Sequence, residues 1–168
     1  MPRPFRFAIQ AFSATSKSQW VDLARKVEDS GFSTLHVADH LLGPGSKIEG
    51  TGHRVQTLAL IPALTSAAMA TSTLRVGSRM ACVSYHLPTV LTKEMASIDV
   101  LSEGRLLPAF GIGSPLGPEW QALGVDTKTR GRKSDECLEI IRRLWREESV
   151  DFDGAFYKLK GATIAPKP

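Results

Sequence analysis

The chain has 168 residues, of which 42% are hydrophobic and 23% are charged, and its formal net charge is +4. This composition is typical of a soluble globular domain and excludes a disordered or collagen-like chain. No apolar run approaches the ~18 residues of a membrane span, and residues 1–20 lack the apolar core of a secretory signal. We therefore expect a cytoplasmic protein that has no membrane partner.

The spacing of the cysteines and the clustering of charges exclude further classes of protein. Cys82 and Cys137 stand alone, without the spacing of zinc ligands or of a disulfide framework, so we expect two free buried thiols and no metal site. Basic residues gather between Lys128 and Arg146, but neither a nucleic-acid-binding motif nor stacking aromatics accompany them. We therefore expect a solvated helix face there and no nucleic-acid partner.

The hydrophobic pattern predicts an alternation of strands and helices. Short apolar runs indicate strands, while apolar residues spaced three and four apart indicate helices, two of which end at Gly31 and Gly104. The predicted elements are a strand at Phe5–Gln10, a helix at Ser18–Ser30, a strand at Thr34–Asp39, a helix at Ile61–Ala70, a strand at Leu74–Ser78, a helix between Pro88 and Gly104, a strand at Arg105–Ile112, a helix at Arg132–Arg146 with Leu138, Ile141, Leu144 and Trp145 inward, and a hairpin turned at Asp153–Gly154.

This order of elements predicts an α/β fold with a parallel sheet and right-handed crossovers. The pattern contains four strand–helix units, whereas a closed eight-stranded barrel typically needs ~250 residues. The chain is therefore either a small open α/β sheet or half of a barrel. Both architectures place their chemistry at the carboxyl ends of the strands.

The sequence Ala38-Asp39-His40 stands at the end of the second predicted strand. Alternation puts His36 and His40 on one face and Leu35 and Val37 on the other, so His40 points into the barrel mouth if the apolar pair packs under helices. A histidine there can act as acid or base near neutral pH, because its reference pKa is about 6.5. The structural alternative is a histidine that only hydrogen-bonds a loop. His36 is expected to be a satisfied core residue, and no partner can be assigned to His53 or His86.

The fourth predicted strand has two further features. It ends in Gly111-Ile112-Gly113, and glycines at a strand end let a ligand approach the backbone, although this pattern is equally a turn. It also contains Pro108, which lacks a ladder N–H and should distort a central strand. We expect Pro108→Leu to restore that donor and to stabilise the protein by about 1 kcal/mol. Residues 78–86 form either a bulge over a ring system or an ordinary loop.

Several segments together resemble the bacterial luciferase-like monooxygenase superfamily, and most closely its deazaflavin (coenzyme F420) dependent oxidoreductases. The segments are TLHVADHL, TSTLRVGS, the Tyr85–Pro88 entry to a helix, KEMASIDVLSEGRL, EWQALGVDTKTRGRKSDECLEIIRRLW and the closing FDGAFYKLKGATIAPKP. The resemblance implies that residues 1–168 are one luciferase-like domain, the N-terminal half of a TIM barrel. It also implies hydride transfer between the deazaflavin and a small organic substrate, with the protein handling orientation and the proton.

The resemblance assigns site residues one by one. His40 matches the family's ring-side histidine and is the catalytic candidate, and Asp39 matches the neighbour that the family uses in binding the cofactor's head. Arg79 and Met80 fall where members carry a bulge, often with a cis peptide, behind the ring. Gly111 and Gly113 match the glycines that floor the pocket. Members often have Gly at Ala109 and a Trp or acidic residue at Ser114, which puts the substrate side in doubt.

Two other readings are compatible with the same residues. An FMN-dependent monooxygenase of the same superfamily would activate oxygen instead. A non-catalytic half-barrel would pair with another chain through its open sheet edges. In each case we expect a homo-oligomer, because the inner face, to which one choice of register assigns Phe7, Ile9, His36 and Phe110, lacks its opposite wall.

Overall fold

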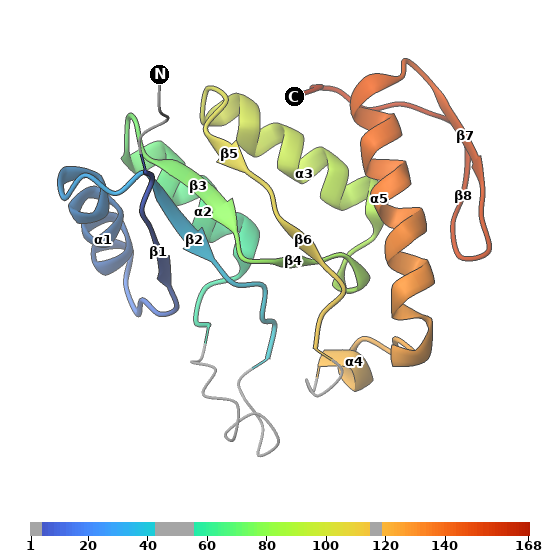
Figure 1. Cartoon of the computed structure of the whole chain (residues 1–168), viewed down its shortest axis with the longest axis horizontal. Coiled ribbons are helices and arrows are strands. Elements are labelled where there is room, and N and C mark those ends of the chain that lie inside the picture. The colour runs from blue at the N-terminus through green and yellow to red at the C-terminus, as the bar shows by residue number, and fades with distance from the viewer. Residues whose placement is uncertain (1–4, 43–55, 115–118) are drawn as a thin grey trace.

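The structure is a computed structural model that describes residues 5–42, 56–114 and 119–168. Its main sheet is parallel, with the strand order β1-β2-β3-β5, and a second short pair joins β4 to β6 (Figure 1). The strands are β1 (Ala8–Ala11), β2 (Thr34–Val37), β3 (Arg75–Ser78), β4 (Ala81–Cys82), β5 (Leu106–Leu107), β6 (Phe110–Gly111), β7 (Val150–Asp153) and β8 (Lys158–Ala162). The helices are α1 (Lys17–Asp29), α2 (Leu60–Ala70), α3 (Pro88–Leu101), α4 (Glu119–Ala122) and α5 (Arg130–Arg146), with short 3₁₀ turns η2 (Val83–Tyr85) and η3 (Thr127–Thr129).

The helices begin and end where their local sequence dictates. Ser16 caps α1 by accepting a hydrogen bond from the backbone N–H of Gln19, and Pro88 occupies the first turn of α3, where its missing N–H costs nothing. Gly31 and Gly104 follow α1 and α3 with φ of 79° and 76°, the left-handed conformation that ends a helix and favours glycine. The predicted helix boundaries are therefore confirmed to within about two residues.

One face of the sheet is buried under helices and the other is open. Leu35 and Val37 are fully buried in a core shared with α1, α2, α3 and α5, as the alternation predicts. The register pairs Ile9 with Leu35 and Gln10 with His36. Since paired residues of parallel strands share a face, Ile9 lies on the helix side. Its assignment to the inner face beside His36 is wrong, because the predicted strand phase was shifted by one residue.

Aromatic packing corrects two more side-chain predictions. The ring of Phe110 lies 6.2 Å from that of Trp145 on α5, so Phe110 belongs to the helix side and not to the inner face. On the same helix Cys137, Ile141 and Leu144 are buried, but Leu138 is 41% exposed and does not face inward. The apolar positions of α5 predicted a broader buried face than the one that packs in the core.

Pro108 divides the fourth predicted strand in two. The pairing of β5 with β3 ends at Leu107, and β6 starts at Phe110 and pairs with β4 instead. The Ser78 hydroxyl bridges the break, since it donates to the carbonyl of Ala109 and accepts from the Ala109 N–H, both at 2.8 Å. The predicted distortion is confirmed. The missing N–H of Pro108 falls outside the paired residues, which removes the reason to expect that leucine would be better.

Hydrogen bonds from side chains to the backbone tie the units together. Arg105 donates to the carbonyls of Ala68, Leu74 and Ser102 and so satisfies the end of α2 and the end of α3 at once. The Glu28 carboxylate accepts from the backbone N–H groups of residues 72, 73 and 74, just before β3. Glu136 on α5 does the same for residues 155–157 in the turn of the predicted hairpin, which forms as β7 and β8.

No helix in the described ranges has the length and apolar character that a bilayer crossing requires.

Candidate functional site

Three segments that are distant in sequence meet at the carboxyl ends of the strands. His40 follows β2, the Arg79–Met80 step follows β3, and Gly111 and Gly113 end and follow β6. In Figure 1 the arrows of β1 to β3 run toward the lower side of the molecule, where α4 also lies. This is the edge at which parallel α/β folds carry their chemistry.

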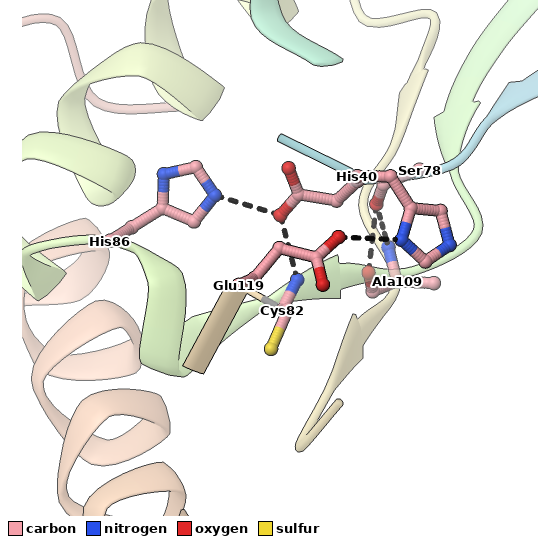
Figure 2. Close-up of polar contacts among 7 residues, drawn as sticks. His40, Ser78, Cys82, His86, Ala109 and Glu119 are labelled. Atoms are coloured by element: carbon pink, nitrogen blue, oxygen red, sulfur yellow. Dashed lines mark hydrogen bonds and ion pairs between the residues drawn. The ribbon is translucent and has the colours of Figure 1, made fainter. Parts of the chain in front are cut away.

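His40 is paired with a buried carboxylate. Its Nδ1 lies 3.1 Å from Oε1 of Glu119 on α4, and its side chain is 28% exposed, whereas that of Glu119 is fully buried. Figure 2 shows the two side chains facing each other from opposite sides of the site. The imidazole is thus held on one side by a carboxylate while part of it reaches the molecular surface.

Asp39, the residue before His40, forms a second pair on the other side of the chain. Its Oδ2 accepts from the backbone N–H of Cys82 at 2.9 Å and lies 2.8 Å from Nε2 of His86 (Figure 2). Burial would lower the pKa of His86, but the hydrogen bond to Asp39 and the charges of Asp39 and Glu94 outweigh it, so the pKa is raised. Asp39 is itself 5% exposed, so its carboxylate fixes β4 and the start of α3 from inside.

The Arg79–Met80 peptide is cis, as the resemblance implies for the bulge. Arg79 turns toward β1, where its Nε donates to Oε1 of Gln10 at 3.3 Å. Met80 is 53% exposed, so this step presents an apolar side chain to the open end of the sheet. Residues 78–86 are therefore a bulge followed by β4 and η2 rather than an ordinary loop.

Gly113 is required by its own neighbours and backbone conformation, whereas Gly111 lies against the flexible side chain of Met80. A Cβ on Gly111 would lie 2.7 Å from Cε of Met80, and one on Gly113 would lie 2.6 Å from Sγ of Cys82. Gly113 also has φ of 74°, which other residues rarely adopt. These contacts explain glycine at position 113, and they place Gly111 against Met80 and Gly113 against Cys82 of β4.

Tyr85 and Trp120 wall the buried side of this arrangement. Their rings meet edge to face with centroids 5.3 Å apart, and the Trp120 indole N–H donates to the carbonyl of Ser114. Burial raises the pKa of the Cys82 thiol to about 11, and burial together with the nearby charges of Cys82 and Glu119 raises that of Tyr85. Both groups therefore stay protonated near neutral pH.

All six predicted site residues lie at this edge, but two residues that contact them, Glu119 and His86, were not predicted. Glu119 is on a four-residue helix with no periodic signal, and His86 had no partner that spacing could identify. For Glu119 the local sequence offers one signal, an acidic residue next to Trp120 ahead of a predicted helix. This pair alone does not indicate a site residue. His53 lies outside the described residues. Within the described ranges, no three His, Cys, Asp or Glu side chains form a metal-ligand cluster.

Comparisons with known proteins identify relatives of this chain. The chain is 30% identical over 155 residues to an F420-dependent glucose-6-phosphate dehydrogenase of Amycolatopsis mediterranei, a match that covers 88% of this chain and 44% of that protein. It is 29% identical to the protein of that name from Nakamurella multipartita, over 99% of this chain and 48% of that one. The chain thus spans less than half the length of these relatives.

Solved structures show the same fold. The monooxygenase RslO1 of Streptomyces bottropensis superimposes with a TM-score of 0.84 at 24% identity, over 97% of this chain and 50% of that one. An F420-dependent secondary alcohol dehydrogenase, solved with an F420–acetone adduct, gives 0.82 at 20% identity, over 97% and 49%. The four-strand sheet is thus a partial barrel. The luciferase-like monooxygenase family matches residues 4–168, and the chain belongs to that family.

Proposed function

We propose that this chain carries the ring-side portion of an oxidoreductase site that uses the deazaflavin coenzyme F420 and acts on a small organic molecule. The observation that carries the proposal is His40, held by Glu119 beside the exposed Met80 bulge at the carboxyl ends of the strands. Relatives that are about 30% identical are named for F420 dependence, which favours this cofactor. The cofactor, when bound, supplies a two-electron hydride carrier.

The residues at this edge fit a flat, largely apolar ring system. Met80 and Ile112 are exposed apolar side chains on neighbouring segments, and the imidazole of His40 adds a polar group beside them. Such a combination of apolar lining with few polar groups is typical of cofactor sites. Arg79, Met80, Gly111 and Gly113 would hold the ring, and Asp39 would fix the backbone of Cys82 behind them.

His40 supplies the proton chemistry in this proposal. Hydride transfer to or from an alcohol or carbonyl moves a proton as well, and a positioned imidazole contributes roughly 100- to 10,000-fold to such steps. The buried hydroxyl of Tyr85 and the buried thiol of Cys82 keep their protons, so neither competes for the role. His40 therefore takes up or gives the proton while the surrounding bulge orients the reactants.

A spectroscopic titration of the purified chain with F420 tests the proposal. We expect saturable binding that a bulky, charged substitution, Met80→Glu, weakens at least 10-fold, while the matched change Met69→Glu on the exposed face of α2 leaves it unaltered. Equal affinity of both variants, or no binding by the wild-type chain at a concentration where it is assembled, would contradict it.

The same titration with FMN addresses the second candidate, an FMN-dependent monooxygenase. That candidate is favoured by the fold shared with RslO1 and with an FMN-bound Baeyer–Villiger monooxygenase of Pseudomonas putida, which superimposes with a TM-score of 0.74. Tight binding of FMN without binding of F420 would replace the deazaflavin proposal with this one.

We also propose that the chain works as part of a homo-oligomer. Within the described residues, β1 and β5 each have a strand neighbour on one side, and Phe5 and Phe7 beside β1 are 92% and 69% exposed. Exposed strand edges and aromatic rings favour association with another chain. Light scattering should show a species larger than one chain, and a folded monomer would argue against this assembly. An oligomer that binds neither cofactor would favour the non-catalytic half-barrel.

A further inference from the structure

Glu119 is an unusual carboxylate for this fold. Its side chain is fully buried, its Oε1 lies against Nδ1 of His40, and its Oε2 has no hydrogen-bond partner among the described residues. A buried carboxylate with one unsatisfied oxygen costs folding free energy that an apolar residue would not. A purely structural role does not account for this cost. Among the described residues, the side chain that the carboxylate of Glu119 contacts is that of His40.

The position of Glu119 is fixed by its neighbour. Trp120 is 4% exposed, packs its ring edge to face on Tyr85, and occupies the space above Gly113, where a Cβ would lie 2.8 Å from the indole ring. These contacts hold α4 against η2 and against the residues that follow β6. The carboxylate therefore meets His40 from a rigid support and not from a mobile surface side chain.

The chemistry of this contact determines where the imidazole carries its proton. An ionised carboxylate only accepts hydrogen bonds, so the nitrogen facing it must be the donor, and in a neutral imidazole the other nitrogen is then the acceptor. In His40 the donor is Nδ1, and Nε2 is the nitrogen at which a proton can be added or removed. Without the carboxylate, the two tautomers would compete.

Building on the proposed function, we propose that Glu119 is the positioning residue of the site, which fixes His40 in the Nδ1–H tautomer so that Nε2 exchanges the proton of the reaction. The exchange is balanced on the imidazole alone: Nε2 gains one proton to give imidazolium or loses it to give the neutral ring. Nδ1 keeps its own proton throughout and donates it in a hydrogen bond to Glu119. Glu119 need not contact the cofactor or the substrate.

The pair formed by Asp39 and His86 lies beside it and serves as an internal comparison. There the carboxylate also holds a backbone N–H, that of Cys82, and the imidazole side chain is 17% exposed. This pair joins two segments of the fold. Glu119 binds no backbone N–H, so its hydrogen bonding is directed at His40 alone among the described residues.

Nitrogen NMR of the chain labelled at its histidine rings tests the inference without cofactor or substrate. Signals of His40 are identified by their loss in His40→Gln. In the neutral wild-type imidazole we expect the proton on Nδ1 and none on Nε2, because Nδ1 faces the carboxylate of Glu119. In Glu119→Gln we expect a mixture of tautomers, and in Glu139→Gln, an exposed change on α5, the wild-type pattern. A neutral wild-type ring protonated at Nε2 overturns the inference even if the variant fails to fold.

Two further measurements, of F420 affinity and of turnover, separate this inference from the proposed function. F420 affinity of Glu119→Gln should stay within about twofold of wild type, whereas kcat in any reaction that the wild-type protein catalyses should fall about 10- to 100-fold with KM unchanged. An unaltered kcat in a folded variant whose tautomer has shifted contradicts the positioning role. Absence of F420 binding by the wild-type protein rejects the proposed function and leaves the tautomer result standing.

Discussion

Nε2 of His86 lies 2.8 Å from Oδ2 of Asp39, although 47 residues separate the two in sequence. The contact joins the end of β2 to the residues that start α3. Because Asp39 also holds the backbone of Cys82, one buried carboxylate connects three parts of the site. The relationship has a direct consequence for stability as a function of pH.

Stability should fall as the pH rises through the folded-state pKa of His86. Burial opposes the charge, but Asp39 and Glu94 raise the pKa of His86 above its ordinary value of 6.5. The pair therefore contributes its full stability below pH 6.5, and this contribution is lost as the pH rises through the higher folded-state value. Denaturant midpoints measured across this range should show the loss in wild type.

The variant His86→Gln should flatten this alkaline slope. His36 has the opposite sign, because burial lowers its pKa, so its contribution rises with pH up to about 6.5. His36→Gln is therefore the matched control and should leave the alkaline slope intact. An alkaline slope that survives in His86→Gln would assign it to another group.

Replacing His40 with alanine should reduce turnover by about 100-fold or more while the fold is retained. In the proposed function the imidazole transfers the proton, and the carboxylate of Glu119 that contacts it is unchanged in the variant. Initial rates followed at the cofactor absorbance, with thermal unfolding as a check, measure the effect. Gln121→Ala on the exposed side of α4 is the control. Undiminished turnover in His40→Ala would remove this residue from the mechanism.

Glu28→Gln should lower the free energy of unfolding by about 1–2 kcal/mol near neutral pH. Partial burial alone would raise the pKa of Glu28, but hydrogen bonds from the backbone of residues 72–74 and from the Thr73 hydroxyl lower it to about 2. Its contribution is therefore present above the ordinary value of 4.5 and is lost as the pH falls toward about 2. Urea melts of wild type and variant should converge in acid, and parallel curves would contradict the assignment.

Pro108→Leu should destabilise the protein slightly, by about 0.4–1 kcal/mol, contrary to the expectation from sequence. The proline lies in the break between β5 and β6, where Ser78 supplies the bridging hydrogen bonds. The substitution adds no paired donor and frees the unfolded chain, which proline restricts. A higher denaturant midpoint for the variant would contradict this prediction and would show that the break between β5 and β6 does not depend on proline.

Gly113→Ala should cost more stability than Gly124→Ala. Both glycines have positive φ, so both substitutions pay a similar backbone cost. Only Gly113 is enclosed, since its Cβ would meet Cys82 and Trp120, whereas Gly124 has nothing within 4 Å. The difference between the two thermal midpoints therefore isolates the packing between β6 and α4. Equal losses would mean that α4 can move aside.

The sequence was informative where a local pattern decides the structure. The helices around Trp20, Met95 and Ile141 follow from apolar spacing, and the break at Pro108 follows from a missing donor. Strand phase was less certain, because in a four-residue edge strand such as β1 one residue of shift moves Ile9 to the other face. The phase depends on the partner strand, which no local pattern contains.

The candidate site divides in the same way. His40 could be found because it stands at a strand end, and the cis step at Arg79–Met80 was implied by the resemblance. Glu119 and His86 could not be assigned, because their roles arise only from contacts with residues 79 and 47 positions away. Side-chain contacts between distant segments depend on the tertiary structure, and the periodicity of either segment does not predict them.

The open face of the sheet also restricts how two chains can meet. Its polar side chains include Gln10, paired with Arg79, and Arg75, which shares the Gln10 side of the sheet through Thr34. A two-fold axis through the centre of this face would set the arginines of one copy against those of the other, an arrangement that like charges disfavour. This repulsion favours a symmetric pair whose axis lies along a sheet edge, and it favours a partner that brings carboxylates when the face itself is covered.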